Sequence, residues 1–361
     1  MATQTEPILL EQIPWSDPLF GEPQKLSAEL AAQARQELGR VPSWLVHLAR
    51  CTWLARAGIA TATPKLAHIS IDTAALAGLI VSQDNSCRYC YGSHRAFLKL
   101  LGYPDQRVRR LEQDLHMADF SPAEKAALDF VRQISRANPR PARSEREALE
   151  RAGFSKPAVA ELAYVAACMC FLNRVSTLLA VPPEAEQAGI AMQLMRPLIA
   201  FMIRKKMAHK PVPAPARNDG PFAEVVSALE GSPSAQVLRN VIDDAWTSAG
   251  LGPRPKAMVV AVVGRALGCP VAANRAKQML EPHGLNGADV EELLATLASP
   301  KLDPFESRLV VFARETVRYR TDMIQRRMRE FSAGLAPEQV LEVVGITSLA
   351  NAVCRLSILL S

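Results

Sequence analysis

The amino-acid sequence predicts an all-α protein made of two similar halves, and three observations lead to this fold class. Apolar residues recur at helical spacing along most of the 361 residues, and alternation of the kind found in half-buried strands is hard to find. Apolar residues make up 49% of the chain and charged residues 22%, which is enough for a sizeable core. Similar segments also recur 181 to 182 residues apart, on the two sides of a Pro-rich stretch.

The helix that carries the most chemistry is expected to begin at Cys87. Asn85 and Ser86 directly before it are good N-cap residues. Apolar residues continue the helical pattern to a stop at Gly102 and Pro104. The sequence therefore predicts a helix of about three turns between these two signals.

Three reactive side chains lie on one face of that helix. Cys87, Cys90 and His94 are separated by three and then four residues, so they lie one above another. Both cysteines would lie in the first turn, where free backbone N–H groups and the helix dipole favour a thiolate. A cysteine of low pKa is a nucleophile, and a second cysteine one turn away can resolve the product as a disulfide.

The same motif has other interpretations. A C-x-x-C pair can be half of a zinc site with His94 as third ligand, but no second pair of ligands at zinc spacing follows. A structural disulfide is disfavoured, because the chain has seven cysteines and no secretory signal is evident. The other close pair, Cys168 and Cys170, lies in an apolar run and is expected to be buried. A redox-active dithiol is the interpretation we prefer.

Net charge and targeting signals indicate which partners and which cellular compartment this chemistry has. The net charge is +6, but arginines are scattered among acidic residues, which indicates solvated helix faces and no nucleic-acid groove. Residues 1–23 contain no apolar signal segment, so we expect a cytoplasmic protein whose thiols are reduced at rest. The apolar tract 190–203 is too short for a membrane span. We expect it to pack between domains; a membrane-surface helix is the alternative.

The repeat divides the chain into two domains, residues 1–185 and 218–361, joined by a helical and Pro-rich linker at 186–217. Glu161 corresponds to Glu342, and residues 174–179 correspond to 355–360. The offset also takes Cys87 to Cys269, whereas Cys90 and His94 map onto alanines at positions 272 and 276. The second half therefore keeps the helix and loses the dithiol, and we expect it to be a structural partner with Cys269 as a small buried residue.

Residues 87–94 resemble the signature of the alkylhydroperoxidase D-like group, in the carboxymuconolactone decarboxylase superfamily. Residues 79–86 are similar to the segment that directly precedes the motif in that group. Residues 173–176 resemble part of the last helix of the unit in the peroxidase-related branch. The resemblance is good over about 39–183 and weak over 222–361. It implies two tandem alkylhydroperoxidase D-like helical domains and a homo-oligomer.

The resemblance also implies a reaction, the reduction of a hydroperoxide. Cys90 would attack the peroxide, Cys87 would resolve the sulfenic acid, and His94 would belong to a proton relay, with an external disulfide reductant restoring the dithiol. From the residues alone, Cys87 would be the nucleophile, because it lies nearest the helix terminus. No metal, flavin or nicotinamide cofactor is expected, since no nucleotide-binding motif is present.

Two positions depart from the group's pattern. The glutamate that the group places twelve residues before the first cysteine is Ala75 here, and Asp72, one turn earlier, is the candidate to substitute for it in the relay. Tyr89 stands where the best-known form has a histidine, so general-base work would fall mainly on His94. These departures leave two other functions open, a redox sensor or scaffold without turnover and a decarboxylase-like activity on the same fold.

Overall fold

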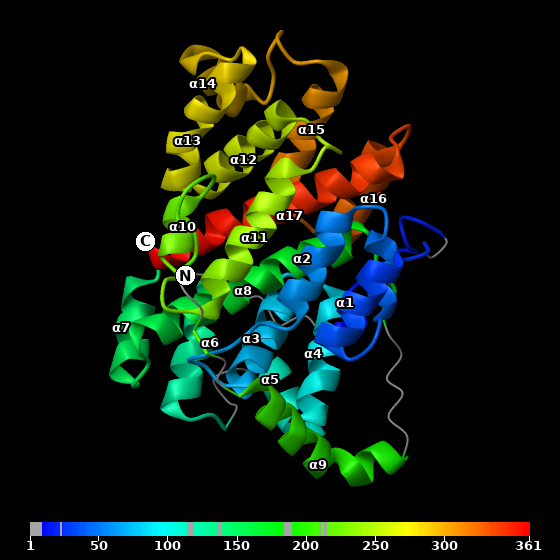
Figure 1. Ribbon diagram of the computed structural model, residues 1–361, viewed down its shortest axis with the longest axis vertical. Coiled ribbons are helices and arrows are strands. Elements are labelled where there is room, and N and C mark those ends of the chain that lie inside the picture. The colour runs from blue at the N-terminus through cyan, green and yellow to red at the C-terminus, as the bar shows by residue number, and fades with distance from the viewer. Residues whose placement is uncertain are drawn as a thin grey trace.

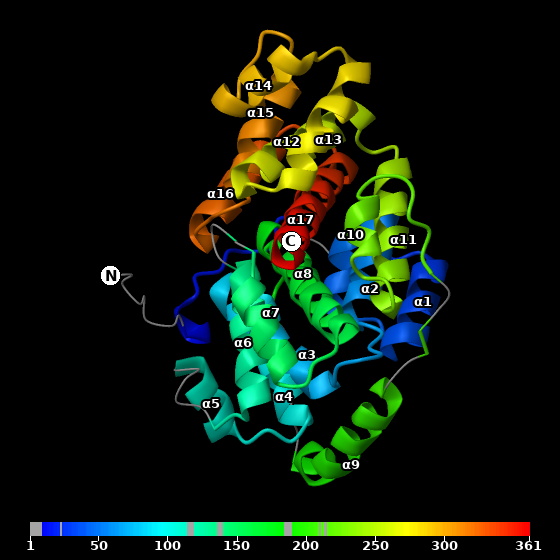
Figure 2. The ribbon, with the colours of Figure 1, turned by 90° about the vertical axis from the view of Figure 1, so that its left-hand side faces the viewer.

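Two long helices, α8 (Lys156–Leu178) and α17 (Pro337–Leu360), pack against each other at the centre of the protein (Figures 1 and 2). The computed structural model describes residues 9–21, 24–113, 119–135, 139, 141–183, 190–208, 211–212 and 215–361. These residues form helices, turns and loops and contain no strand. The predicted all-α fold class is therefore confirmed.

The first half surrounds α8 with helices from the N-terminal part of the chain. Among them, α3 packs against α4, α6 and α8, and α2 packs against α1 and α8. Their bounds are α1 (Ala28–Leu38), α2 (Thr52–Ala62), α3 (Ile71–Asp84), α4 (Arg88–Leu100), α5 (Asp105–Gln113), α6 (Pro122–Ser135) and α7 (Arg143–Arg151), with the 3-10 helices η1 (Leu10–Gln12) and η2 (Ser43–Leu48).

The second half surrounds α17 in a similar way, with α12 packed against α13, α15 and α17. Its α11 lies beside α2, so the two halves also meet through these helices. The bounds are α10 (Ala223–Ser227), α11 (Pro233–Thr247), α12 (Pro253–Leu267), α13 (Pro270–Leu280), η3 (Glu281–His283), α14 (Gly287–Thr296), α15 (Pro304–Glu315) and α16 (Thr321–Ser332).

Helix starts in the two halves recur at the spacing of the sequence repeat. The first residues of α3 and α12, of α4 and α13, of α5 and α14, and of α6 and α15 are each 182 residues apart, and those of α8 and α17 are 181 apart. One continuous cluster of buried hydrophobic residues nevertheless extends through both halves. Two separate domains with the bounds 1–185 and 218–361 therefore stay a prediction.

Two buried glutamates at corresponding places in α8 and α17 join the halves. Glu161 is fully buried and accepts hydrogen bonds from the backbone N–H groups of residues 67–69 at 2.8–2.9 Å and from Ser232 Oγ at 2.9 Å. Glu342 accepts from Trp53 Nε1 and Ser248 Oγ and lies 3.8 Å from the ammonium of Lys256. Each carboxylate thus receives a donor from the other half, which satisfies its charge away from water.

Two buried arginines make a second set of crossed contacts. Arg174 of α8 donates to the carbonyl oxygens of Thr316 at 3.1 Å and Val317 at 3.2 Å, just after α15. Arg355 of α17 donates to the carbonyl oxygens of Ile134 in α6 at 2.7 Å and Val317 at 2.8 Å. Each guanidinium lies at the C-terminal end of a helix from the opposite half, where the helix dipole favours a cation.

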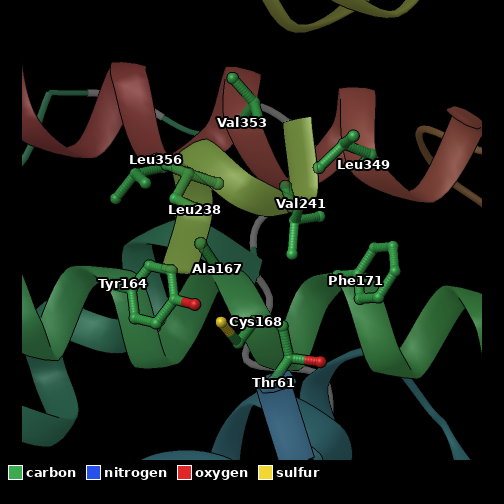
Figure 3. Close-up of a pocket in the computed structure, with 11 residues that line it drawn as sticks. Thr61, Tyr164, Ala167, Cys168, Phe171, Leu238, Val241, Leu349, Val353 and Leu356 are labelled. Carbon is green, nitrogen blue, oxygen red and sulfur yellow. The ribbon is translucent and has the colours of Figure 1, made fainter. Parts of the chain in front are cut away.

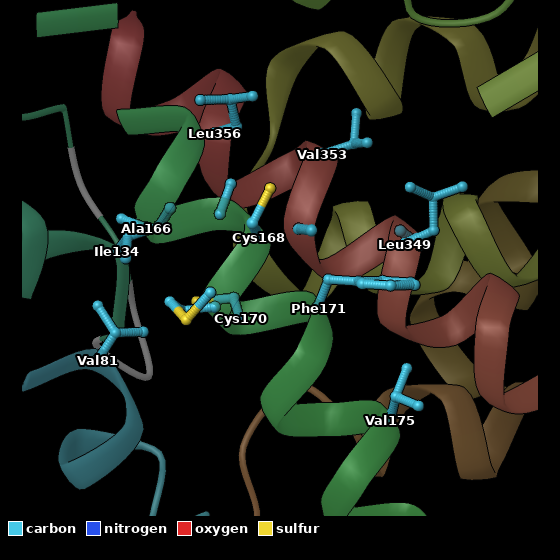
Figure 4. Packing of buried hydrophobic residues seen from close by; sticks show 14 of the residues in the cluster. Val81, Ile134, Ala166, Cys168, Cys170, Phe171, Val175, Leu349, Val353 and Leu356 are labelled. Carbon is cyan, nitrogen blue, oxygen red and sulfur yellow. The ribbon is translucent and has the colours of Figure 1, made fainter. Parts of the chain in front are cut away.

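The interface between α8 and α17 is apolar and nearly filled. A cavity of about 20 Å³, roughly the volume taken by one water molecule, remains between α8, α11 and α17, and Tyr164 and Cys168 line it (Figure 3). Phe171 of α8 and Leu349 and Val353 of α17 also line this cavity (Figures 3 and 4). By length and composition both long helices could span a membrane, but their most apolar windows are 94% and 89% buried inside the protein. We interpret them as core helices.

Helix α9 (Ile190–Met207) departs from the expectation of a helix packed between domains. It lies at the edge of the protein beside α4 (Figure 2), and large apolar side chains on it, including Phe201 and Met202, are about 60% exposed. Its Arg204 forms an ion pair with Asp72 of α3, and this contact fixes α9 at the periphery. Residues 186–189, 209–210 and 213–214 of the predicted linker, and residues 1–8 and 22–23 of the N-terminal segment, lie outside the described residues.

Candidate active site

The turn between α3 and α4 positions the first thiol. Ser86 takes a left-handed conformation, with φ of 51°, and its N–H donates to the carbonyl of Gln83 while the N–H of Cys87 donates to that of Ser82. This pair of bonds closes the C-terminus of α3 in the pattern of a Schellman motif. Cys87 itself is the N-cap of α4, which corrects the expectation that Asn85 and Ser86 cap this helix. Ser86 is instead used to end the preceding helix.

The two thiols of the motif are buried and interact directly. Cys87 is fully buried, Cys90 is 6% exposed, and the N–H of Cys90 donates to Cys87 Sγ at 3.5 Å. Burial alone would raise the pKa of Cys87, but hydrogen bonds from the thiol and the N–H of Cys90, together with the nearby Thr177 side chain, outweigh it and lower that pKa. Burial and the hydrogen bond to Cys87 raise the pKa of Cys90. When the pair loses one proton, these shifts favour its loss from Cys87, while Cys90 stays protonated.

Helix α8 forms the opposite wall of the thiol site. Cys90 Sγ lies 3.6 Å from Ser176 Oγ, and Nε2 of His94 lies 2.9 Å from Met169 Sδ, two turns earlier on α8. The face of α4 that carries Cys87, Cys90 and His94 therefore packs against α8. This arrangement agrees with the sequence prediction that the three side chains share one face of the helix.

His94 is held as a neutral imidazole. Its ring also packs against α3, where a Cβ placed on Gly78 would lie 2.6 Å from Nδ1. Burial lowers the pKa of His94 to about 4, because the charged form would lose its hydration. The sequence analysis assumed the ordinary pKa of a histidine, near 6.5, so burial makes this side chain a weaker base than expected.

The structure does not bring Asp72 to the thiols. Both carboxylate oxygens of Asp72 accept from Arg204, at 2.9 and 2.6 Å, and Arg204 also donates to the carbonyl of Leu101 at the end of α4. Cys87 lies at the opposite end of this 13-residue helix, about 20 Å away at a rise of 1.5 Å per residue. The contacts of Asp72 therefore give it no part in a proton relay with Cys90.

Residues of the second half close over the thiol site. Thr321 Oγ1 donates to the carbonyl of Ser86 at 2.9 Å, and Gln325 Nε2 donates to the carbonyl of Thr177 at 3.1 Å. The ring of Tyr319 lies under the guanidinium of Arg174, whose carbon is 5.6 Å from the ring centroid. Sequence reasoning missed these residues, since more than 220 positions separate them from the cysteines and no motif marks them.

Among the described residues, no three His, Cys, Asp or Glu side chains lie close enough together to hold a metal ion. Cys168 and Cys170 are buried in the core, as expected, and burial raises the pKa of Cys168 to about 12 (Figure 4). Burial thus disfavours a thiolate at Cys168, in contrast to Cys87.

Comparisons with known proteins find similar solved structures, and two of them serve as examples. A peroxidase-related protein from Ralstonia eutropha JMP134, described as an alkylhydroperoxidase AhpD core, is 21% identical; the match covers 50% of this chain and 98% of that one, with a TM-score of 0.42. A peroxidase-related protein from Silicibacter sp. TM1040 is 24% identical over 52% of this chain and 96% of its own, with a TM-score of 0.40. No family model and no curated protein matches the sequence.

Proposed function

We propose that this protein is a thiol-dependent oxidoreductase that reduces hydroperoxides through a Cys87–Cys90 dithiol–disulfide cycle. The observation that carries the proposal is the hydrogen-bonded thiol pair at the N-terminus of α4, in which Cys90 stabilises a thiolate at Cys87. The sequence motif supports the same chemistry, because residues 87–94 resemble a peroxidase signature.

The reaction proceeds in two covalent steps. A thiolate sulfur attacks the peroxide, the O–O bond breaks, and the alcohol leaves with a proton while the cysteine becomes a sulfenic acid. The second thiol then attacks that sulfur and releases water, which leaves a disulfide. An external dithiol reductant returns the pair to its starting state. His94 lies on the face of α4 that carries both cysteines, and its neutral ring can accept a proton from the thiol pair.

Two lines of reasoning assign the first attack to different cysteines. The resemblance assigns it to Cys90, whereas the hydrogen bonds of the reduced pair leave the negative charge on Cys87. The variants Cys87→Ser and Cys90→Ser separate these assignments. The variant that keeps the attacking cysteine still consumes one equivalent of hydroperoxide and then stops as a sulfenic acid, which a 1,3-diketone probe traps.

The test of the function is sustained consumption of an organic hydroperoxide in the presence of excess dithiothreitol. Wild type is expected to turn over, and both cysteine variants are expected to lose most of this turnover. Cys51→Ser is a matched control, because this cysteine is also buried, its thiol donates to Glu342, and a serine can still donate to that carboxylate. Turnover at the wild-type rate in both Cys87→Ser and Cys90→Ser would overturn the proposal.

A redox sensor is the second candidate, and the burial of the site favours it. Both thiols are at most 6% exposed, the pKa of His94 is lowered to about 4, and Asp72 lies away from the pair. A sensor would be oxidised once by hydroperoxide and would not be recycled by the reductant within the assay. Stoichiometric oxidation without turnover would therefore assign the protein to this class.

The setting of the activity is part of the same proposal. A cytoplasmic location would keep the thiols reduced between turnovers. The homo-oligomer and the external reductant follow from the sequence resemblance and stay predictions. Light scattering coupled to size exclusion measures the first, and a screen of cellular dithiol reductants in the turnover assay identifies the second.

A further inference from the structure

The second half repeats the turn that presents Cys87. Gly268 takes a left-handed conformation, with φ of 66°, and its N–H donates to the carbonyl of Arg265 while the N–H of Cys269 donates to that of Gly264. Cys269 is then the N-cap of α13, as Cys87 is the N-cap of α4. The backbone of Cys269, with φ of −79° and ψ of 112°, is close to that of Cys87, with −90° and 96°. The repeat therefore keeps the thiol-presenting turn in both halves.

The partner of Cys269 comes from another helix. The position that corresponds to Cys90 is Ala272, which packs closely against Gly264 of α12. Cys354 of α17 fills the adjacent space: a Cβ placed on Gly264 would lie 3.7 Å from its Sγ, and its thiol is hydrogen-bonded to that of Cys269. Alignment of the two halves does not reveal this pair, because the second thiol of each pair lies on a different helix. Cys90 is on α4, the helix that Cys87 caps, whereas Cys354 is on the central helix α17.

The charge distribution in this pair matches that of the first dithiol. Hydrogen bonds from the Cys354 thiol, from the N–H of Ala272 and from Ser357 outweigh burial and lower the pKa of Cys269 to about 6. The hydrogen bond to Cys269, together with burial, raises the pKa of Cys354. At neutral pH, Cys269 is therefore the thiolate and Cys354 the protonated thiol.

Both thiols are buried, but their chain neighbours differ. Cys269 is 1% exposed, and the residues next to it in the chain, Gly268 and Pro270, are exposed. Cys354 is also 1% exposed, and its chain neighbours are buried. We therefore expect a small oxidant to reach Cys269 first, and its hydrogen-bonded partner Cys354 is placed to attack the product.

We propose that Cys269 and Cys354 are a second redox centre, in which a hydroperoxide forms a disulfide that joins α13 to α17. The Cys269 thiolate attacks the peroxide, the O–O bond breaks, and the alcohol, or water from hydrogen peroxide, leaves with a proton. The Cys354 thiol then attacks the sulfenic acid and releases one water molecule. The peroxide is reduced by two electrons, and two thiols are oxidised to one disulfide.

The experiment uses the full chain with Cys87→Ser and Cys90→Ser, so that only the second centre can form. Dilute hydrogen peroxide at neutral pH is expected to remove two thiols per chain, and peptide mapping without reductant is expected to show Cys269 joined to Cys354. Adding Cys354→Ser should stop the reaction at a sulfenic acid on Cys269, which a 1,3-diketone probe labels. Adding Cys269→Ser should leave Cys354 as a thiol. Near-ultraviolet circular dichroism establishes that each variant is folded.

The pH dependence distinguishes a redox centre from a packing role. The oxidation rate should be nearly constant above pH 7 and should fall toward tenfold per pH unit below the thiolate pKa of about 6. Cys269 and Cys354 that stay reduced, in folded protein and under conditions that fully oxidise N-acetylcysteine, would overturn the proposal. The result does not depend on the first dithiol, because a wild type without peroxide turnover can still form this disulfide.

Discussion

Replacing Gly78 by alanine tests the position of His94 without changing His94 itself. Gly78 lies inside α3, and the imidazole occupies the space where a side chain would be. An added Cβ would lie 2.6 Å from Nδ1 and 2.7 Å from Nε2, against about 3.5–4.0 Å for ordinary contacts between non-bonded carbon atoms. The ring cannot move away freely, because Met169 of α8 lies 2.9 Å from its other side.

Two opposing terms set the size of the effect. Alanine is favoured over glycine inside a helix by about 1 kcal/mol. Crowding a packed interior costs about 1–3 kcal/mol, since side chains or backbone must shift. Gly92 of α4 is the matched control: it is also helical, and the nearest atom to its Cβ would be Leu10 Cδ2 at 3.8 Å. Gly78→Ala should therefore be about 1–3 kcal/mol less stable than Gly92→Ala.

Urea unfolding of both variants measures this difference, and the hydroperoxide assay reports the effect on the site. Gly78→Ala should consume hydroperoxide more slowly than Gly92→Ala, because the displaced ring no longer faces the thiol pair. Equal stability of the two variants would refute the packing argument. Equal turnover together with a measured loss of stability would remove His94 from the relay.

Three further outcomes follow from buried groups. Glu161→Ala should lower the free energy of unfolding by about 3–5 kcal/mol, because four hydrogen-bond donors lose their charged acceptor. The control Glu150→Ala, on the exposed face of α7, should change this free energy by less than about 0.5 kcal/mol. Urea unfolding compares the two variants. Burial lowers the pKa of His94 from about 6.5 to about 4, so as pH falls the unfolded chain takes up a proton before the folded protein does. The free energy of unfolding of the wild type should therefore fall by up to about 3 kcal/mol between these two pH values. His94→Gln should lose less over the same pH range. Thr177→Val removes a hydroxyl near Cys87 that helps to lower its pKa, so the pKa of Cys87 should rise and its alkylation at pH 7 should slow several-fold. An unchanged pH profile of alkylation would exclude this contribution.

Local patterns in the sequence predicted much of the first site. The three- and four-residue spacing of Cys87, Cys90 and His94 depends only on helix geometry, and it places all three on the face toward α8. The repeat offset likewise anticipated where the helices of the second half begin. These features depend on neighbours in sequence, so a single chain contains enough information to find them.

Features that depend on tertiary contacts could not be predicted in this way. Asp72 lies one turn before Ala75, as expected from the sequence. Its carboxylate is bound by Arg204, which is 132 residues away in the chain. The low pKa of His94 comes from burial between α3 and α8. Cys354 becomes the partner of Cys269 only because α17 packs against α13.

A single-turnover experiment tests the central claim most directly. Reduced protein carrying Cys269→Ser, which removes the nucleophile of the second centre, receives one equivalent of an organic hydroperoxide without reductant, and the alcohol, the remaining thiols and the disulfide-linked peptides are measured together. Our account predicts one alcohol released for every two thiols lost, with a disulfide between Cys87 and Cys90. Alcohol release while both of these cysteines stay reduced would contradict the account.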